Sequence, residues 1–174
     1  MSGSVYEVSE NTRQLEDNMI VYIASPFFKP DELERIQIIE KMIVSRGHEV
    51  ISPRNFGILP PKASLEIRAK VFAKNTQSID KSNLVLALLQ SDDTGTIWEI
   101  GYAYGVGVPV IGMCSQDKIN LMLAQSFAGF VRNNTELTDF LRLKDYGYAY
   151  AEEHDFNPID FTWEVSQQWR KEIY

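Results

Sequence analysis

Two short, uninterrupted apolar runs constrain the fold of this chain more than any other feature. Residues 19–25 (MIVYIAS) and 84–89 (LVLALL) contain no charged residue, and Pro26 directly follows the first run. A strand with one solvated face alternates polar and apolar residues, whereas a strand buried on both faces of a parallel sheet is apolar throughout. The two runs therefore predict central strands of a parallel sheet that is covered by helices on both faces.

The segments around these runs continue the alternation of strand and helix. We expect helices over residues 31–46, 63–82, 96–105 and 119–125, and short strands over residues 48–52, 109–113 and 129–131. In the second helix the apolar side is formed by Leu65, Ile67, Val71, Phe72 and Ile79. Strands that alternate with helices predict an α/β fold with right-handed crossovers. We expect a three-layer, flavodoxin-like or Rossmann-like fold with a five-stranded parallel sheet.

The length of 174 residues fits one domain. Residues 1–18 are polar and without periodicity, which predicts a flexible N-terminal extension to a single domain over residues 19–174. Within that domain residues 145–174 form an aromatic-rich C-terminal arm, with too many aromatic side chains for a disordered tail. We expect the arm to pack on an edge of the sheet or on a neighbouring subunit.

The charge distribution argues against nucleic acid as a partner. The net charge is −7, but the excess of acidic residues lies at the two ends, and residues 19–144 hold 14 basic and 13 acidic residues without a basic stripe. A single cysteine, Cys114, and the absence of a leader or a long apolar run predict a cytoplasmic protein with no membrane segment. Small molecules are the expected partners.

No cofactor and no metal site is expected. The chain has two histidines and one cysteine, too few for the clusters that zinc requires. A magnesium site made of carboxylates has weak support from the adjacent Asp92 and Asp93.

In folds of this kind ligands bind beyond the carboxyl ends of the strands. The loop after the first strand holds no glycine, so it lacks the cradle of free amides that a phosphate group needs, and an unphosphorylated ligand is favoured. Phe27 and Phe28 in this loop suit stacking on a flat base, although aromatic loop residues more often cover a core.

The densest group of reactive side chains lies in residues 90–101 (QSDDTGTIWEIG), where Asp92, Asp93 and Glu99 converge after the second apolar run. We expect Glu99 in the first turn of a helix, where the helix dipole favours the ionised form of a nucleophile or base, with Gly95 opening space around the carboxylate. The alternative is a capping box, in which Thr96 caps the helix and Glu99 bonds back to the capping amide.

Three segments in this order resemble the nucleoside 2-deoxyribosyltransferases: residues 20–28 (IVYIASPFF), 92–101 (DDTGTIWEIG) and 119–122 (INLM). The resemblance runs from about Met19 to Phe161. It implies transfer of 2-deoxyribose from one purine or pyrimidine base to another with retention at C1′, and with hydrolysis of the nucleoside as a side reaction.

The resemblance also implies roles for individual residues. Glu99 matches the nucleophile that forms a covalent deoxyribosyl-enzyme, and Tyr22 matches a tyrosine that orients this carboxylate; its alternative is a buried strand tyrosine. Asp93 matches an acceptor for a sugar hydroxyl, while Asp92 is either a second ligand or a turn residue. Asn120 matches an asparagine that reaches the sugar 5′-hydroxyl in a neighbouring subunit, which implies a homo-oligomer, a hexamer or dimer-based, with a shared site; its alternative is a helix cap.

Asn75 is a departure from the family pattern. The family shows an aspartate at this position that protonates the leaving base, whereas an amide can only donate or accept hydrogen bonds to the base. Two other functions stay open. One is an N-glycosidase that hydrolyses nucleoside 5′-monophosphates, because such enzymes carry a similar G-T-x-x-E segment, although the missing glycine-rich phosphate loop disfavours it. The other, which Asn75 suggests, is a non-catalytic module that binds a nucleoside or nucleotide.

Overall fold

The computed structural model describes residues 18–90, 93–115 and 119–146 and forms a three-layer α/β fold around one parallel sheet. The strands are β1 (Ile20–Ala24), β2 (Glu49–Ile51), β3 (Leu84–Leu88), β4 (Val110–Met113) and β5 (Gly129–Val131). The helices are α1 (Pro30–Val44), α2 (Leu65–Asp80), α3 (Thr94–Gly105), α4 (Leu121–Ser126) and α5 (Asn134–Tyr146), with a 3₁₀ turn at Pro53–Phe56.

The strand order is β2-β1-β3-β4-β5, and every pair is parallel. This is the flavodoxin-like order, so the expected fold is confirmed. Tyr22 in β1 pairs with Val85 in β3, which places the two apolar runs side by side at the centre of the sheet. All five residues of β3 are buried, as a strand covered on both faces must be.

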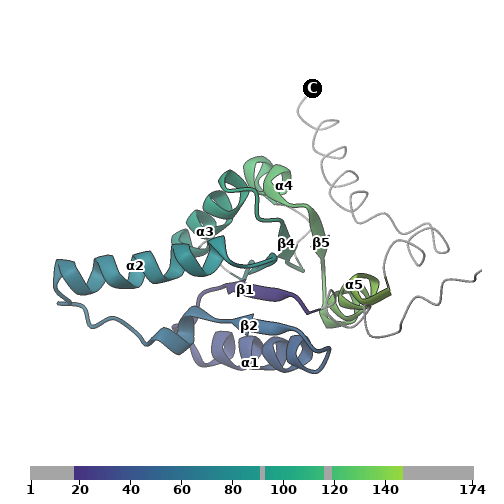
Figure 1. Cartoon of the computed structure of the whole chain (residues 1–174), viewed down its shortest axis with the longest axis horizontal. Coiled ribbons are helices and arrows are strands. Elements are labelled where there is room, and N and C mark those ends of the chain that lie inside the picture. The colour runs from purple at the N-terminus through teal and green to yellow at the C-terminus, as the bar shows by residue number, and fades with distance from the viewer. Residues whose placement is uncertain (1–17, 91–92, 116–118, 147–174) are drawn as a thin grey trace, which may run out of the picture.

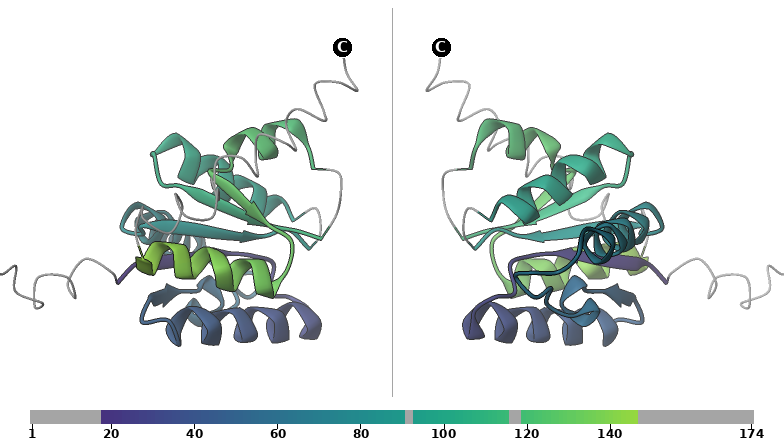
Figure 2. Two further views of the ribbon diagram at one scale, coloured as in Figure 1. Left: turned by 90° about the vertical axis from the view of Figure 1, so that its right-hand side faces the viewer. Right: turned by 90° about the vertical axis from the view of Figure 1, so that its left-hand side faces the viewer.

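The two faces of the sheet are covered by different helices (Figures 1 and 2). Alternate residues of β3 divide accordingly: Leu84, Leu86 and Leu88 pack with α1 and α5, whereas Val85 and Ala87 pack with the side of α2, α3 and α4. Tyr22 belongs to the second group. Its side chain is therefore directed toward the helix that carries Glu99.

The boundaries of the predicted elements differ from the observed ones by at most two residues, and one helix was not predicted. Helix α3 begins at Thr94, two residues before the predicted start, because Asp93 rather than Thr96 is its N-cap. Helix α5 was not predicted, although Leu137, Phe140 and Leu141 are buried at helical spacing and Asn133 accepts hydrogen bonds from the first backbone amides. The predicted extension and most of the C-terminal arm lie outside the described residues.

In helix α2 the burial of the apolar residues differs from the prediction. Of the five predicted for its apolar side, Ile79 is fully buried, whereas Leu65 is 83% exposed and Ile67 and Phe72 are also exposed. Figure 1 shows the reason: the first half of α2 extends beyond the edge of the sheet. The apolar pattern of this half is therefore not satisfied by the core of its own chain.

Within the part of the chain that the structure describes, no helix is both long and apolar enough to cross a membrane.

Candidate active site

A tyrosine and a glutamate from distant parts of the sequence form the centre of the site. The Tyr22 hydroxyl donates a hydrogen bond of 2.6 Å to Oε1 of Glu99, which links the middle of β1 to the second turn of α3. Tyr22 is fully buried, so packing of the core fixes the position of its ring. Among the described residues no hydrogen bond reaches Oε2 of Glu99. The contact therefore holds one carboxylate oxygen and leaves the other for a ligand.

The environment of Glu99 favours its neutral form. Burial raises the pKa of this carboxyl from 4.5 to about 7, the hydrogen bond from Tyr22 opposes the rise, and the negative charge of Asp93 adds to it. Burial, the charge of Glu99 and the shared hydrogen bond also raise the pKa of Tyr22, so its hydroxyl remains a donor at neutral pH.

The prediction that the helix dipole favours the ionised form of Glu99 is therefore wrong. Glu99 is the sixth residue of α3, because the helix starts at Thr94. The field of the helix terminus falls off within the first turn, so it does not offset the cost of removing the carboxylate from water.

Asp93 caps helix α3. Its Oδ2 accepts hydrogen bonds from the backbone amide of Thr96 at 2.7 Å and from the Thr96 hydroxyl at 2.8 Å. The capping box considered for Thr96 and Glu99 is therefore not formed, and Glu99 is not used to close the helix end. Oδ1 of Asp93 accepts no hydrogen bond within the described residues and remains able to bind a ligand.

Gly95 allows this cap rather than opening space at Glu99. A Cβ at this position would lie 3.2 Å from Oδ2 of Asp93, closer than most side-chain contacts, so a larger residue would press on the capping carboxylate. The glycine thus acts on the site through Asp93.

Two further polar side chains have a buried atom that finds no hydrogen-bond partner among the described residues: Oδ1 of Asn75 on α2 and Nε2 of Gln90, which follows β3. Gln90 was not singled out from the sequence. Its position directly after a buried strand, on the edge where ligands bind in this fold, is the signal that could have identified it.

Within the described part of the chain, no hydrogen bond joins the remaining predicted residues to Glu99. Asn120 is the N-cap of α4 and accepts a hydrogen bond from the Met122 amide at 2.9 Å, so the helix-cap alternative holds; its side chain is nevertheless exposed. Phe27 packs against the core on the side of α1 and α5. Phe28 is 65% exposed and stacks on Phe27 with 4.9 Å between ring centroids.

Asp92 lies outside the described residues, so the structure does not place the carboxylate pair considered for magnesium. Within residues 18–90, 93–115 and 119–146, no three histidine, cysteine, aspartate or glutamate side chains come together as metal ligands.

Comparison with known proteins decides the family. The model of the nucleoside 2-deoxyribosyltransferase family matches residues 21–157, which is most of the chain. The chain belongs to this family. Tyr22, Asn75, Asp93, Glu99 and Asn120 all lie in the matched region.

Solved structures agree with this assignment. A 2-deoxyribosyltransferase from Bacillus psychrosaccharolyticus is 29% identical with a TM-score of 0.63, and the match covers 75% of this chain and 94% of that one. A conserved protein from Enterococcus faecalis has 19% identity and a TM-score of 0.63, with 73% and 99% covered. A CMP N-glycosidase from Clostridium botulinum has 22% identity and a TM-score of 0.52, with 71% and 98% covered; these last two share the fold.

A search of curated proteins finds no match to this nucleoside 2-deoxyribosyltransferase family member.

Proposed function

We propose that this protein is a nucleoside 2-deoxyribosyltransferase that moves 2-deoxyribose between nucleobases through a covalent intermediate on Glu99. The observation that carries the proposal is the hydrogen bond between the Tyr22 hydroxyl and one oxygen of the partly buried Glu99 carboxylate. A carboxylate held by one oxygen and partly shielded from water is suited to attack an electron-poor carbon. Membership of the family gives that carbon as C1′ of a deoxynucleoside.

The reaction proceeds in two displacements. Oε2 of ionised Glu99 forms a bond to C1′ while the bond from C1′ to the base nitrogen breaks, and the base leaves with that electron pair and takes up a proton. A second base then attacks C1′ with its nitrogen lone pair, loses a proton and releases the Glu99 carboxylate. Two inversions at C1′ give net retention, as in retaining glycosidases, and water in place of the second base gives hydrolysis.

Tyr22 is a positioning residue in this scheme. Its hydroxyl donates to Oε1 while Oε2 carries out the attack, and this hydrogen bond stabilises the carboxylate that is present before the first displacement and after the second. Oδ1 of Asp93 is available to accept a hydrogen bond from a sugar hydroxyl. Leaving bases are protonated by water, because Asn75 has no acidic proton to give.

A chromatographic assay tests the proposal. The protein is incubated with thymidine or deoxyinosine and free adenine, beside Glu99→Gln, which preserves size and removes the nucleophile. We expect deoxyadenosine with the unaltered protein and none with the variant. Free sugar phosphate released from a nucleoside monophosphate would instead assign the protein as an N-glycosidase. Substrates left unchanged across several bases would indicate a binding module.

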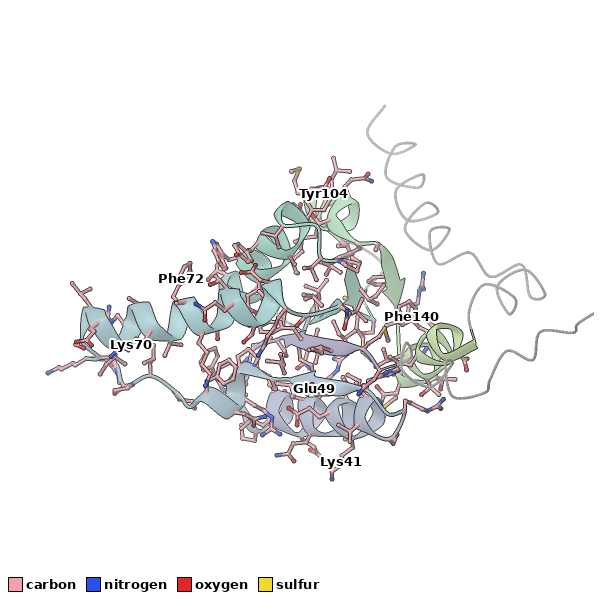
Figure 3. The ribbon with its side chains drawn as sticks, in the orientation of Figure 1. Lys41, Glu49, Lys70, Phe72, Tyr104 and Phe140 are labelled. Carbon is pink, nitrogen blue, oxygen red and sulfur yellow. The ribbon has the colours of Figure 1, made fainter. Side chains whose placement is uncertain are left out.

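We further propose that the site is completed by a second copy of the chain. Helix α3 carries no charged residue other than Glu99, yet its Ile97, Trp98 and Tyr104 side chains are exposed, and a cluster of exposed apolar side chains is typical of an interaction surface. Exposed apolar side chains lie on α3 and on the two helices that contact it, α2 and α4, and Figure 3 labels two of them, Phe72 and Tyr104. This apolar face consists of Phe72, Ile97, Trp98, Tyr104, Leu121 and Met122.

Asn120 directly precedes Leu121 and Met122 on this face, so association would bring its side chain to the neighbouring copy. Met122→Glu places a charge on a side chain that is 75% exposed, and Ile38→Glu on α1 makes the same change outside the apolar face. Sedimentation analysis should show a smaller species for Met122→Glu and an unchanged one for Ile38→Glu. A monomeric unaltered protein with full activity would contradict the shared site.

A further inference from the structure

The start of helix α2 is the part of the fold that the core and the proposed reaction leave unexplained. Every residue from 64 to 70 is exposed, and these include Leu65 at 83% and Ile67 at 47%. Figure 1 shows this part of α2 projecting away from the sheet. Helices in proteins owe most of their stability to an apolar face that packs on another element. An exposed start of a helix with apolar side chains therefore indicates that another segment covers it in solution.

The same part of the chain carries unbalanced positive charge. Residues 62–70 hold three basic side chains and one acidic side chain, Glu66. Glu66 is paired with Lys70 at 2.7 Å. The side chain of Arg68 donates its hydrogen bonds to two backbone carbonyl oxygens, which do not neutralise its charge. A segment that covers residues 64–70 should therefore combine apolar and acidic side chains.

The C-terminal arm of this chain has that composition. Residues 147–174, which lie outside the described residues, contain seven aromatic side chains, and they hold six acidic residues against two basic ones. The N-terminal extension over residues 1–17 is also acidic, but it has one aromatic residue, Tyr6. Aromatic rings bury more area than other side chains when they pack on an apolar surface. The arm is therefore the better match in both charge and apolar content.

The position of α5 decides which copy of the arm is suited to this surface. Helix α5, from which the arm continues, packs with α1 on one face of the sheet, whereas α2 packs on the other face. Figure 1 shows α2 and α5 on opposite sides of the molecule. The arm of the same copy would have to pass around the sheet to reach the start of α2. The arm of a second copy has no such constraint.

We propose that residues 64–70 of α2 bind the C-terminal arm of a second copy of this chain. The aromatic side chains of the arm cover Leu65 and Ile67, and its carboxylates lie near Arg68 and Lys70. Opposite charges select the partner and the apolar contacts hold it. This surface includes no residue of the apolar face of α3 and no residue of the proposed reaction, so the inference goes beyond the proposed function and does not rest on it.

Carbodiimide cross-linking of the full chain identifies the segment that occupies this surface. Nitrogen-15-labelled and unlabelled protein are mixed in urea and refolded together, and the melting temperature confirms that native protein is recovered. Mass spectrometry should find amide bonds from Lys62 or Lys70 to carboxylates within residues 152–172, in pairs of one labelled and one unlabelled peptide. The bond between Lys70 and Glu66 within one helix shows that the reagent has acted.

Hydrogen exchange shows whether the start of α2 is covered. In Leu65→Glu the new charge repels the acidic arm, whereas a glutamate in the first turn favours the helix itself. The backbone amides of residues 68–71 should exchange at least about tenfold faster in this variant, the effect of losing one buried leucine contact. Ile38→Glu makes the same change on α1, where Ile38 is 45% exposed, and should leave the exchange of α2 unchanged.

Three results would overturn the inference. Cross-links to the arm within single copies only would assign the surface to the arm of the same chain, and cross-links from Lys62 and Lys70 that never reach the arm would reject the arm as the partner. Equal exchange of residues 68–71 in Leu65→Glu and the unaltered protein would show that no segment held by Leu65 covers them.

The transfer assay separates this failure from failure of the proposed function. New nucleosides without the expected cross-links would support the transferase and reject this inference. The expected cross-links in a protein that forms no new nucleoside would support the inference and reject the transferase.

Discussion

Removal of the Tyr22 hydroxyl is the most direct test of how this protein controls its candidate nucleophile. In Tyr22→Phe, Oε1 of Glu99 loses the hydrogen bond of 2.6 Å while the ring still fills the core. A hydrogen bond to a charged group contributes about 1.5–3 kcal/mol, which corresponds to about one to two pK units. Since this bond opposes the rise caused by burial, the pKa of Glu99 should move upward from about 7.

The sign of the effect on activity follows from the role of the carboxylate. The nucleophile is the ionised form, so kcat/KM for deoxyribosyl transfer should rise with pH through about 7 in the unaltered protein. In Tyr22→Phe the same rise should occur about one pH unit higher or more. Carbon-13 NMR titration of the Glu99 carboxyl gives the same pKa where catalysis is too slow to measure.

Tyr102→Phe is the matched control. Tyr102, three residues after Glu99 on α3, also donates a hydrogen bond to a carboxylate, Oδ1 of Asp80 at 2.8 Å, but this hydrogen bond is more exposed and does not involve Glu99. This variant should leave the pH profile unchanged. A pKa of Glu99 that stays near 7 or falls in Tyr22→Phe would refute the reasoning, because the hydroxyl would then not stabilise the ionised carboxylate.

Three other predictions follow from the packing and charges of the site. The pKa of Glu99 is raised in the folded state from 4.5 to about 7, so the protein loses stability as the pH rises through this window. Urea unfolding should show that the unaltered protein loses about 3 kcal/mol of stability, relative to Glu99→Gln, between pH 4 and 8. Asp93→Asn keeps the N-cap of α3 and removes the charge that raises the pKa of Glu99, so the pH profile of activity should move to lower pH with little change in stability. Asp93→Ala also removes the cap and should lower the free energy of unfolding by about 1 kcal/mol; equal stability of the two variants would argue against the cap. Gly112→Ala places a Cβ 2.6 Å from the Phe127 ring and should lower stability by about 1–3 kcal/mol, while Gly101→Ala, with no atom within 4 Å, should not destabilise; similar melting temperatures would contradict this packing.

Much of the fold can be predicted from the sequence, because strands and helices depend largely on local patterns of apolar and polar residues. The continuous apolar runs around Tyr22 and Val85 predict central parallel strands, because only strands covered on both faces lack polar positions. Helix α5 carried a similar signal in Asn133 and the spacing of Leu137 and Leu141, and it was missed because its polar residues dominate the segment. For α2 the apolar pattern predicted a buried helix face, but most of its apolar residues are exposed, since periodicity does not tell which partner buries a helix face.

The sequence by itself determined the family resemblance, the parallel sheet and the candidates Glu99, Tyr22 and Asp93, since these depend on residue type and local spacing. Tertiary structure alone decided what they do to one another. Tyr22 and Glu99 are 77 residues apart, and their contact exists because β1 and α3 pack on one face of the sheet. That same packing removes water from Glu99, which outweighs the helix dipole and raises its pKa.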